Sequence, residues 1–328
     1  MKRVFYIGLL IMAFVGTANF AFAQEEAKPE ETGWKKGAGI GLDLSQLVQI
    51  NPKQGAGQNT LGLGGAINFF ANKKDGRIAW DNLGVFQFGI QRLGSGLIAQ
   101  GSGDVKVPFQ KAIDELRFNS KIGYQAKEGS KLYYAADFSF MSQLTPTYVG
   151  NENFPGNYLT ELDNTTLAAK LFAPATITLS LGLDYKVSDK LSIFFSPLGS
   201  KFIIVADDNI AALNIHGNPV GENVFKALGA LARINYVNKF AGDKVGYTTS
   251  MSLFSNYLKE PQNIDVDWAN EFSFQIFKGL SAALTMNVFY DHDVQVQVSD
   301  FSKIGGVSGV GRRVSLTEQF LLKYTKEF

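Results

Sequence analysis

Apolar and polar residues alternate along most of this chain, and the pattern is clearest between positions 176 and 205. From position 177 to position 185 the odd positions carry isoleucine, leucine or tyrosine, whereas the even positions carry threonine, serine, glycine or aspartate. A period of two is typical of a β-strand with one apolar face. The polar residues at 188–190 favour a turn, so the segment is predicted to form an antiparallel hairpin.

The same alternation recurs throughout residues 34–328 and predicts about twelve strands. The expected strands lie near residues 34–45, 59–72, 80–91, 115–124, 132–144, 176–185, 191–205, 227–240, 245–257, 264–276, 280–290 and 314–328. Short polar turns follow the even-numbered strands, and generally longer loops follow the odd-numbered ones. The expected long loops are polar or rich in glycine and include residues 94–110, 146–170, 207–222 and 299–313. Sorting of connections by parity is typical of transmembrane barrels, and a water-soluble sandwich has no reason to show it.

Two features favour lipid as the environment of the apolar faces. Tryptophan and tyrosine fall near the expected strand ends, where the interfacial girdles of membrane barrels lie. These residues are Trp80, Tyr185, Tyr247, Tyr257, Trp268 and Tyr290. The opposite face of the strands is polar, as in a solvated lumen. We therefore expect an all-β fold, an antiparallel up-and-down transmembrane β-barrel of about 12 strands, with a secreted all-β domain as the alternative.

Residues 1–23 have the features of a cleaved signal peptide. Two basic residues precede an apolar run at 4–15, and Ala21 and Ala23 are the small residues that a signal peptidase reads. The run is shorter than the ~20 residues of a membrane helix. A signal peptide is therefore favoured over an N-terminal membrane anchor.

The remaining organisation is a short tail followed by the barrel. Residues 24–33 are acidic, contain a proline and show no periodicity, which predicts a disordered periplasmic tail. Beyond the signal no apolar run approaches the ~20 residues of a membrane helix, so strands must make any membrane crossing. The barrel is expected to span residues 34–328 and to lie in the outer membrane of a Gram-negative bacterium.

Composition excludes several classes of function. Without the signal the chain has 29 Lys and Arg against 30 Asp and Glu, a net charge of −1, which argues against nucleic-acid binding. Aromatic residues make up 13% of the chain, and 34 glycines accompany only 9 prolines, as suits a strand-rich protein. The chain has no cysteine, which excludes disulfides, thiolate metal sites and lipoprotein acylation.

Several short motifs, taken in order, carry a family resemblance. They are Ser45-Gln46, Trp80-Asp81-Asn82, Gly182-Leu183-Asp184-Tyr185 with Ser196-Pro197-Leu198, Leu253-Phe254-Ser255-Asn256-Tyr257-Leu258, and Asp265-Val266-Asp267-Trp268. Over residues 34–328 the chain resembles the domain-of-unknown-function family 3078 of predicted outer-membrane β-barrel proteins. Two features depart from the family pattern: Asn51-Pro52 stands where an Asn-Trp pair is expected, and the last strand lacks the usual glycine before its terminal aromatics. The resemblance implies a fold and a location but no activity.

The two histidines, His216 and His292, do not indicate an enzyme. Barrel hydrolases of the outer membrane orient a histidine with a neighbouring serine, asparagine or carboxylate, because imidazole must be positioned to act as a general base. Neither histidine here has a serine two residues away on the same face. We interpret both as surface polar residues and expect no catalytic residue.

Other polar clusters also lack the pattern of a dedicated site. The acidic pairs Asp207-Asp208 and Asp265 with Asp267 offer oxygen ligands for calcium, but without the spacing of a calcium loop. Turn chemistry and a solvated lumen explain them better. The glycine clusters precede no helix that could bind phosphate at its N-terminus. We therefore expect no metal site and no cofactor.

The candidate site is a set of charged residues that the alternation places on the lumen side. These lumen-facing candidates are Glu115, Arg117, Lys121, Asp137, Asp184 and Arg233. They are compatible with solute passage, but the structural interpretation, in which opposite charges brace the barrel wall, is favoured.

Three functions stay open on the sequence alone. The most favoured is a narrow channel or transporter for small solutes. The alternative is a scaffold or interaction barrel that displays its loops to a partner protein or lipoprotein, and an outer-membrane enzyme is least favoured. Expected partners are outer-membrane lipid and, during biogenesis, the barrel-assembly machinery; no nucleic acid is expected.

Overall fold

The computed structural model describes residues 33–50, 60–92, 110–150, 157–292, 296–299 and 307–327 of the chain. The predicted signal peptide at 1–23 and nearly all of the predicted tail at 24–33 lie outside these described residues. The account below concerns the unit that runs from Gly33 onward.

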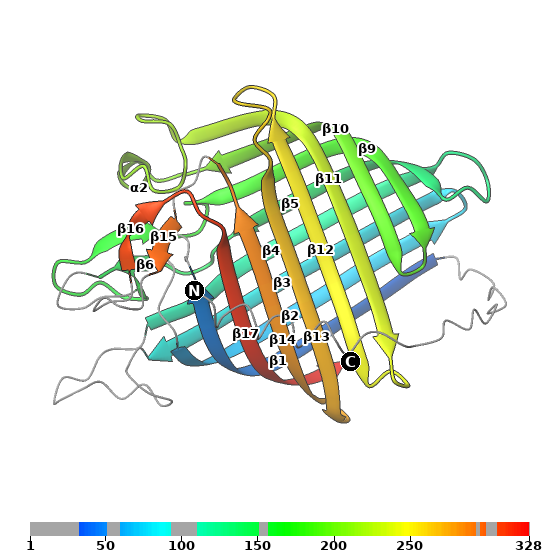
Figure 1. Cartoon of the computed structure of the whole chain (residues 1–328), viewed down its shortest axis with the longest axis horizontal. Coiled ribbons are helices and arrows are strands. Elements are labelled where there is room, and N and C mark those ends of the chain that lie inside the picture. The colour runs from blue at the N-terminus through cyan, green and yellow to red at the C-terminus, as the bar shows by residue number, and fades with distance from the viewer. Residues whose placement is uncertain are drawn as a thin grey trace, which may run out of the picture. The chain divides into compact units, whose positions relative to one another are not determined.

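Twelve long strands form one closed antiparallel sheet (Figure 1). They are β1 Gly33–Ile50, β2 Thr60–Asp75, β3 Ile78–Arg92, β4 Gln110–Gln125, β5 Leu132–Ser142, β9 Ala175–Ser188, β10 Leu191–Ile204, β11 Val224–Phe240, β12 Val245–Asn256, β13 Asp265–Phe277, β14 Leu280–Tyr290 and β17 Ser315–Glu327. The first strand, β1, pairs with both β2 and β17, and β3 also pairs with β4. Every one of the twelve strands therefore has two neighbours, which confirms the predicted up-and-down barrel.

The connections between the strands differ at the two ends of the barrel. At one end they contain 2 to 6 residues, and at the other they contain 8 to 32. The β2–β3 turn is typical of the short end, because Gly76 adopts the left-handed φ of 53° that a tight hairpin requires. Short turns are periplasmic and long loops extracellular in membrane barrels, which orients the chain across the bilayer.

The outer surface of the barrel is apolar. Many large hydrophobic side chains on the outer parity of the strands stay exposed, and Leu42, Leu63 and Tyr134 reach 65%, 63% and 60%. Near the periplasmic turns, Trp34 and Trp80 contact each other with ring centroids 5.6 Å apart. These exposures suit a surface that faces lipid, with aromatic side chains at the interface.

The long loops differ from the sequence prediction, which treated them as plain polar segments. They contain β6 Thr147–Val149, β7 Asn157–Tyr158, β8 Thr166–Ala169, α2 Asp208–Ala212, β15 Val296–Ser299 and β16 Val307–Gly311. Figure 1 shows α2, β6, β15 and β16 at the same end of the barrel. Alternation could not reveal these elements, because each is too short to establish a period. Among the described residues, no helix is long and apolar enough to cross a bilayer.

The strand packing predicts that one glycine stabilises the barrel. A Cβ atom on Gly229 would overlap the carbonyl oxygen of Ser255 on the next strand, whereas one on Gly65 would make only ordinary contacts. We expect Gly229→Ala to destabilise the barrel by about 1–3 kcal/mol and Gly65→Ala to have little effect.

The check is electrophoresis in detergent after stepwise heating, in which a folded barrel migrates faster unheated than boiled. Gly229→Ala should lose the fast band at a lower temperature than the wild type and Gly65→Ala. Equal melting of both variants, or recovery of the wild type from the soluble periplasm, would contradict the packing described.

Candidate functional site

The polar face of the strands lies on the concave side of the sheet. The Nη1 atom of Arg233 on β11 lies 3.1 and 3.2 Å from the two carboxylate oxygens of Asp137 on β5. Two strands, β9 and β10, separate β5 from β11, so the two backbones would lie about 14 Å apart in a flat sheet. Side chains can close that gap only where curvature makes them converge, which is inside the barrel.

All six candidate charged residues are found in ion pairs. Besides the Arg233–Asp137 pair, Lys121 Nζ lies 2.8 Å from Asp184 Oδ2 across β5. Arg117 and Glu115, two residues apart on β4, pair at 3.0 Å. The Asp137 and Asp184 side chains are only 5% and 3% exposed. Two of the three pairs therefore connect non-adjacent strands and hold the inner wall together.

An apolar cluster extends the same part of the wall. Phe194, Leu231 and Phe254 come from three consecutive strands and are between 2% and 8% exposed. They share the inner face with the ion pairs, because Phe194 stands opposite both Asp184 and Arg233 in the strand registers. Sequence reasoning missed this cluster. Residues 193–195 are all apolar, so no alternation shows which of them points into the barrel.

The opposite part of the inner wall is open. Phe70 on β2 and Leu83 on β3 stand opposite each other and are 41% and 42% exposed. Leu83 shares the inner face, because it stands opposite Asn119, two residues from Lys121. Across the barrel, Asp267 and Ala269 on β13 have inner-face parity and are also exposed. Water thus reaches the inner face at Phe70, Leu83 and Ala269, whereas it is excluded at Phe194 and Leu231.

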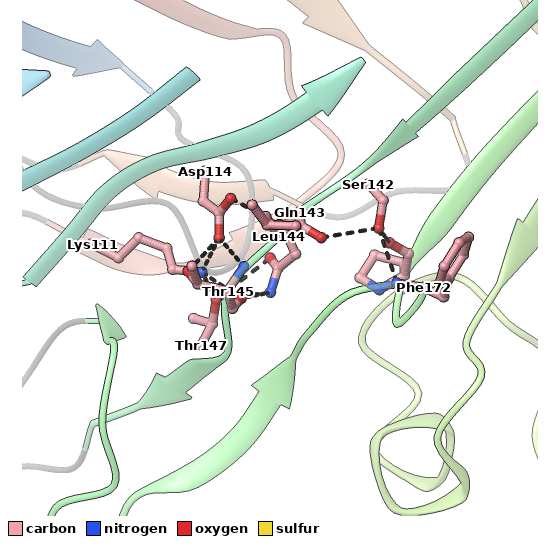
Figure 2. Close-up of polar contacts among 9 residues, drawn as sticks. Lys111, Asp114, Ser142, Gln143, Leu144, Thr145, Thr147 and Phe172 are labelled. Atoms are coloured by element: carbon pink, nitrogen blue, oxygen red, sulfur yellow. Dashed lines mark hydrogen bonds and ion pairs between the residues drawn. The ribbon is translucent and has the colours of Figure 1, made fainter. Parts of the chain in front are cut away.

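A buried ion pair anchors the longest extracellular loop to the rim (Figure 2). Lys111 Nζ donates to Asp114 Oδ2 at 2.7 Å, to Thr147 Oγ1 at 2.8 Å and to the Thr145 carbonyl at 2.9 Å. Asp114 in turn accepts hydrogen bonds from the backbone N–H groups of Leu144 and Thr145. The two charged side chains are 7% and 1% exposed. With all three ammonium donors used, the start of the loop is held firmly against β4.

The end of that loop is anchored to β5 and to the next loop. The Ser142 hydroxyl donates to the Pro174 carbonyl at 2.9 Å and accepts from the Phe172 N–H (Figure 2). Lys170 Nζ donates to Asp207 Oδ2 at 2.6 Å. The pKa of Asp207 lies below its usual range, mainly because its carboxylate accepts this hydrogen bond from Lys170.

The second anchored loop carries α2 and uses the acidic residues that sequence analysis considered for calcium. Asp207 caps α2 by accepting from the N–H groups of Asn209 and Ile210. Asp208 accepts from the Asn223 amide at 2.8 Å. Ile210 is fully buried in a small core between the two loops. Capping and loop packing thus account for Asp207 and Asp208.

The interpretation of both histidines as surface polar residues is wrong for His216. Its Nε2 atom lies 2.7 Å from the Ala168 carbonyl on β8, so it joins the two loops. A carbonyl only accepts, and therefore Nε2 carries the proton and Nδ1 is an acceptor in the neutral ring. Burial is the main cause that lowers the pKa of His216. By contrast, His292 Nε2 lies 3.6 Å from the exposed Glu260.

Closure, an apolar exterior and a polar interior together define a class of protein. In a bilayer every backbone hydrogen bond must be made within the protein, and a closed barrel with these two faces satisfies that requirement. The chain is a transmembrane β-barrel of the outer-membrane type, and the predicted location is confirmed by these features.

The family comparison agrees with the resemblance seen in the sequence. A model of the family described as "Protein of unknown function (DUF3078)" matches residues 45–148. The match includes Ser45-Gln46 and Trp80-Asp81-Asn82 and ends before the motifs that begin at Gly182. Over residues 45–148 the match is to the suspected family. No curated protein matches the chain in sequence.

Several solved structures are similar to the chain. The translocator domain of autotransporter NalP from Neisseria meningitidis is 10% identical, with 90% of each chain covered and a TM-score of 0.38. An outer membrane channel from Pseudomonas putida F1 is 10% identical, covering 92% of this chain and 100% of that chain, with a TM-score of 0.39. The outer membrane channel DcaP of Acinetobacter baumannii is 9% identical, covering 92% of this chain and 99% of that chain, with a TM-score of 0.32.

The half-buried His216, whose pKa is lowered by burial, predicts that the loop packing weakens in acid. Because the folded pKa lies below the usual value of about 6.5, the open loops bind a proton that the packed loops do not. The stabilisation is complete above pH ~6.5 and is lost progressively as the pH falls toward the lowered pKa. Asp207 stays ionised through this range, since its pKa is lowered from 3.8.

Amide hydrogen exchange of β8 and α2 at about pH 7.5 and about pH 5.5, corrected for intrinsic rates, checks this prediction. Protection should fall at the lower pH in the wild type and not in His216→Gln, which retains the donor to Ala168. Equal pH dependence in both proteins would show that another group controls the packing.

Proposed function

We propose that the protein is a narrow channel or transporter for small solutes, not an enzyme, and that its passage follows the open side of the inner wall. The observation that carries this proposal is the difference in exposure between the two sides. On the inner face, Phe70 of β2 and Leu83 of β3 are 41% and 42% exposed. By contrast, Phe194 of β10 and Leu231 of β11 are only 2% and 4% exposed.

Strand number supports a narrow passage. Eight-stranded barrels are filled by side chains, whereas barrels of about sixteen to eighteen strands leave an open aqueous channel. Twelve strands lie between these cases. In this barrel the apolar cluster and two ion pairs occupy the wall from β4 to β12. What remains is a strip of water-accessible wall and not a wide pore.

The ion pairs serve as braces in this proposal. Removing one partner of a buried pair leaves an uncompensated charge, at a cost of about 3–5 kcal/mol, whereas removing both partners avoids that penalty. Asp137 and Asp184 are buried in this way. Arg117 and Glu115 are more exposed, at 43% and 31%, and therefore lie closest to passing solute.

A scaffold role is the second candidate, and the anchored loops favour it. The Lys111–Asp114 pair and the core around Ile210 hold the extracellular loops in one conformation. Rigidly presented loops suit recognition of a partner protein or lipoprotein. Insertion by the barrel-assembly machinery is part of either proposal.

The absence of native cysteine allows the passage to be located with single substitutions. Ala269 on β13 is exposed on the inner face, whereas Ala227 on β11 shares that face but is only 4% exposed. We expect a charged, membrane-impermeant thiol reagent to modify Ala269→Cys quickly and to lower its current in a planar bilayer. The matched variant Ala227→Cys should react at least about tenfold more slowly, because it lies in a closely packed wall. Equal rates would refute the two-sided interior.

Conductance tests the filled wall directly. The wild type should carry at most a small current. The double variant Lys121→Ala/Asp184→Ala removes both partners of one ion pair and frees space inside the barrel, so its current should be about twofold larger. Leu181→Ala removes an outer side chain that is 59% exposed and should leave the current unchanged. A large steady current from the wild type would contradict a narrow lumen. No current from any folded variant would favour the scaffold role.

A further inference from the structure

The two anchored loops enclose a pocket that no step of solute passage requires. Its volume is about 450 Å³, within the range typical of small-molecule sites. One wall comes from the loop between β5 and β9 and carries Gln143, Thr147 and Thr166. The other comes from the segment after α2 and carries Ile215 and His216. The pocket therefore depends on how the two loops pack together.

The polar groups of the pocket are held in place before any ligand arrives. Gln143 Nε2 donates to the Thr145 carbonyl at 3.0 Å and to Thr147 Oγ1 at 3.1 Å. Thr147 is itself bound by the buried Lys111. On the facing wall, the hydrogen bond to Ala168 orients the His216 ring. Such fixed groups reduce the entropy that a ligand must lose on binding.

The lining determines which chemistry fits. None of the described residues that line the pocket is Asp, Glu, Lys or Arg, so a charged ligand would lose its hydration without gaining an ionic partner among them. His216 Nδ1 is an acceptor and calls for a hydroxyl or N–H donor. Val149, Ala168 and Leu213 supply an apolar surface beside these polar groups.

We propose that this pocket binds a small uncharged molecule that combines hydroxyl and amide groups with an apolar patch, as in an N-acetylated monosaccharide. Its hydroxyl donates to His216 Nδ1, its amide N–H donates to Gln143 Oε1, and its methyl group packs against Ala168. The site lies at the extracellular end of the barrel, so the ligand reaches it from outside the cell. The inference does not depend on conduction through the lumen.

The test is titration of the purified, detergent-folded full chain with N-acetylglucosamine, followed by calorimetry or saturation-transfer NMR. We expect saturable binding with a dissociation constant of about 1 mM or lower. Glucosamine has similar size but carries a positive charge, and should bind at least about tenfold more weakly. Absence of saturable binding of N-acetylglucosamine, or equal binding of glucosamine, overturns the proposal.

Two variants locate the binding in the pocket. His216→Gln keeps a donor for Ala168 but loses the Nδ1 acceptor, and should weaken binding about fivefold, as expected for one lost hydrogen bond. Thr166→Trp changes an exposed lining residue to one that fills the pocket, and should abolish binding.

The matched control is His292→Gln, since His292 does not line the pocket. It should bind like the wild type, and all three variants should retain the fast-migrating folded band. Unchanged binding in folded Thr166→Trp would place the sugar elsewhere and refute the assignment. Because each variant is also measured for conductance, failure of the pocket and failure of the channel proposal are separate results.

Discussion

The structure depends on one constraint, which is that every backbone N–H and C=O group within a bilayer must be paired inside the protein. The pairing of β1 with β17 and of β3 with β4 leaves no free edge among the twelve long strands. Closure in turn gives the sheet two unequal faces. Diverging outer side chains such as Leu42 and Leu63 face lipid, and converging inner side chains must pack or pair with one another.

Inner side chains converge inside the barrel, and their different sizes explain why water reaches some of them and not others. On the side from β4 to β12, opposite charges meet across intervening strands, and three large apolar side chains exclude water. On β1, Gly37 has no side chain to fill the interior, and the ring of Phe70 on β2 lies over it. A Cβ atom on Gly37 would overlap that ring. The same polar-in alternation thus produces a filled wall and an open one, depending on residue size at each register position.

The extracellular loops extend this rigidity beyond the membrane. Lys111 and Asp114 lie at the start of a barrel strand and therefore transmit the fixed position of β4 to the loop that follows β5. Through Ala168 and Lys170 this loop then positions α2 and His216. A pocket between two loops is preformed only because both are attached to a closed sheet, which connects the proposed binding site to the same constraint that shapes the barrel.

The sequence by itself determined the barrel class, the strand count, and the sorting of short and long connections. These follow from a local period of two that each strand shows separately. Only the tertiary structure decided that Arg233 meets Asp137, that Phe194 fills the wall, and that His216 holds Ala168. These contacts join residues 48 to 96 positions apart or depend on the exact register between strands. Curvature of the closed sheet brings Arg233 to Asp137, and packing of the two loops brings His216 to Ala168. No local pattern in the sequence encodes either contact.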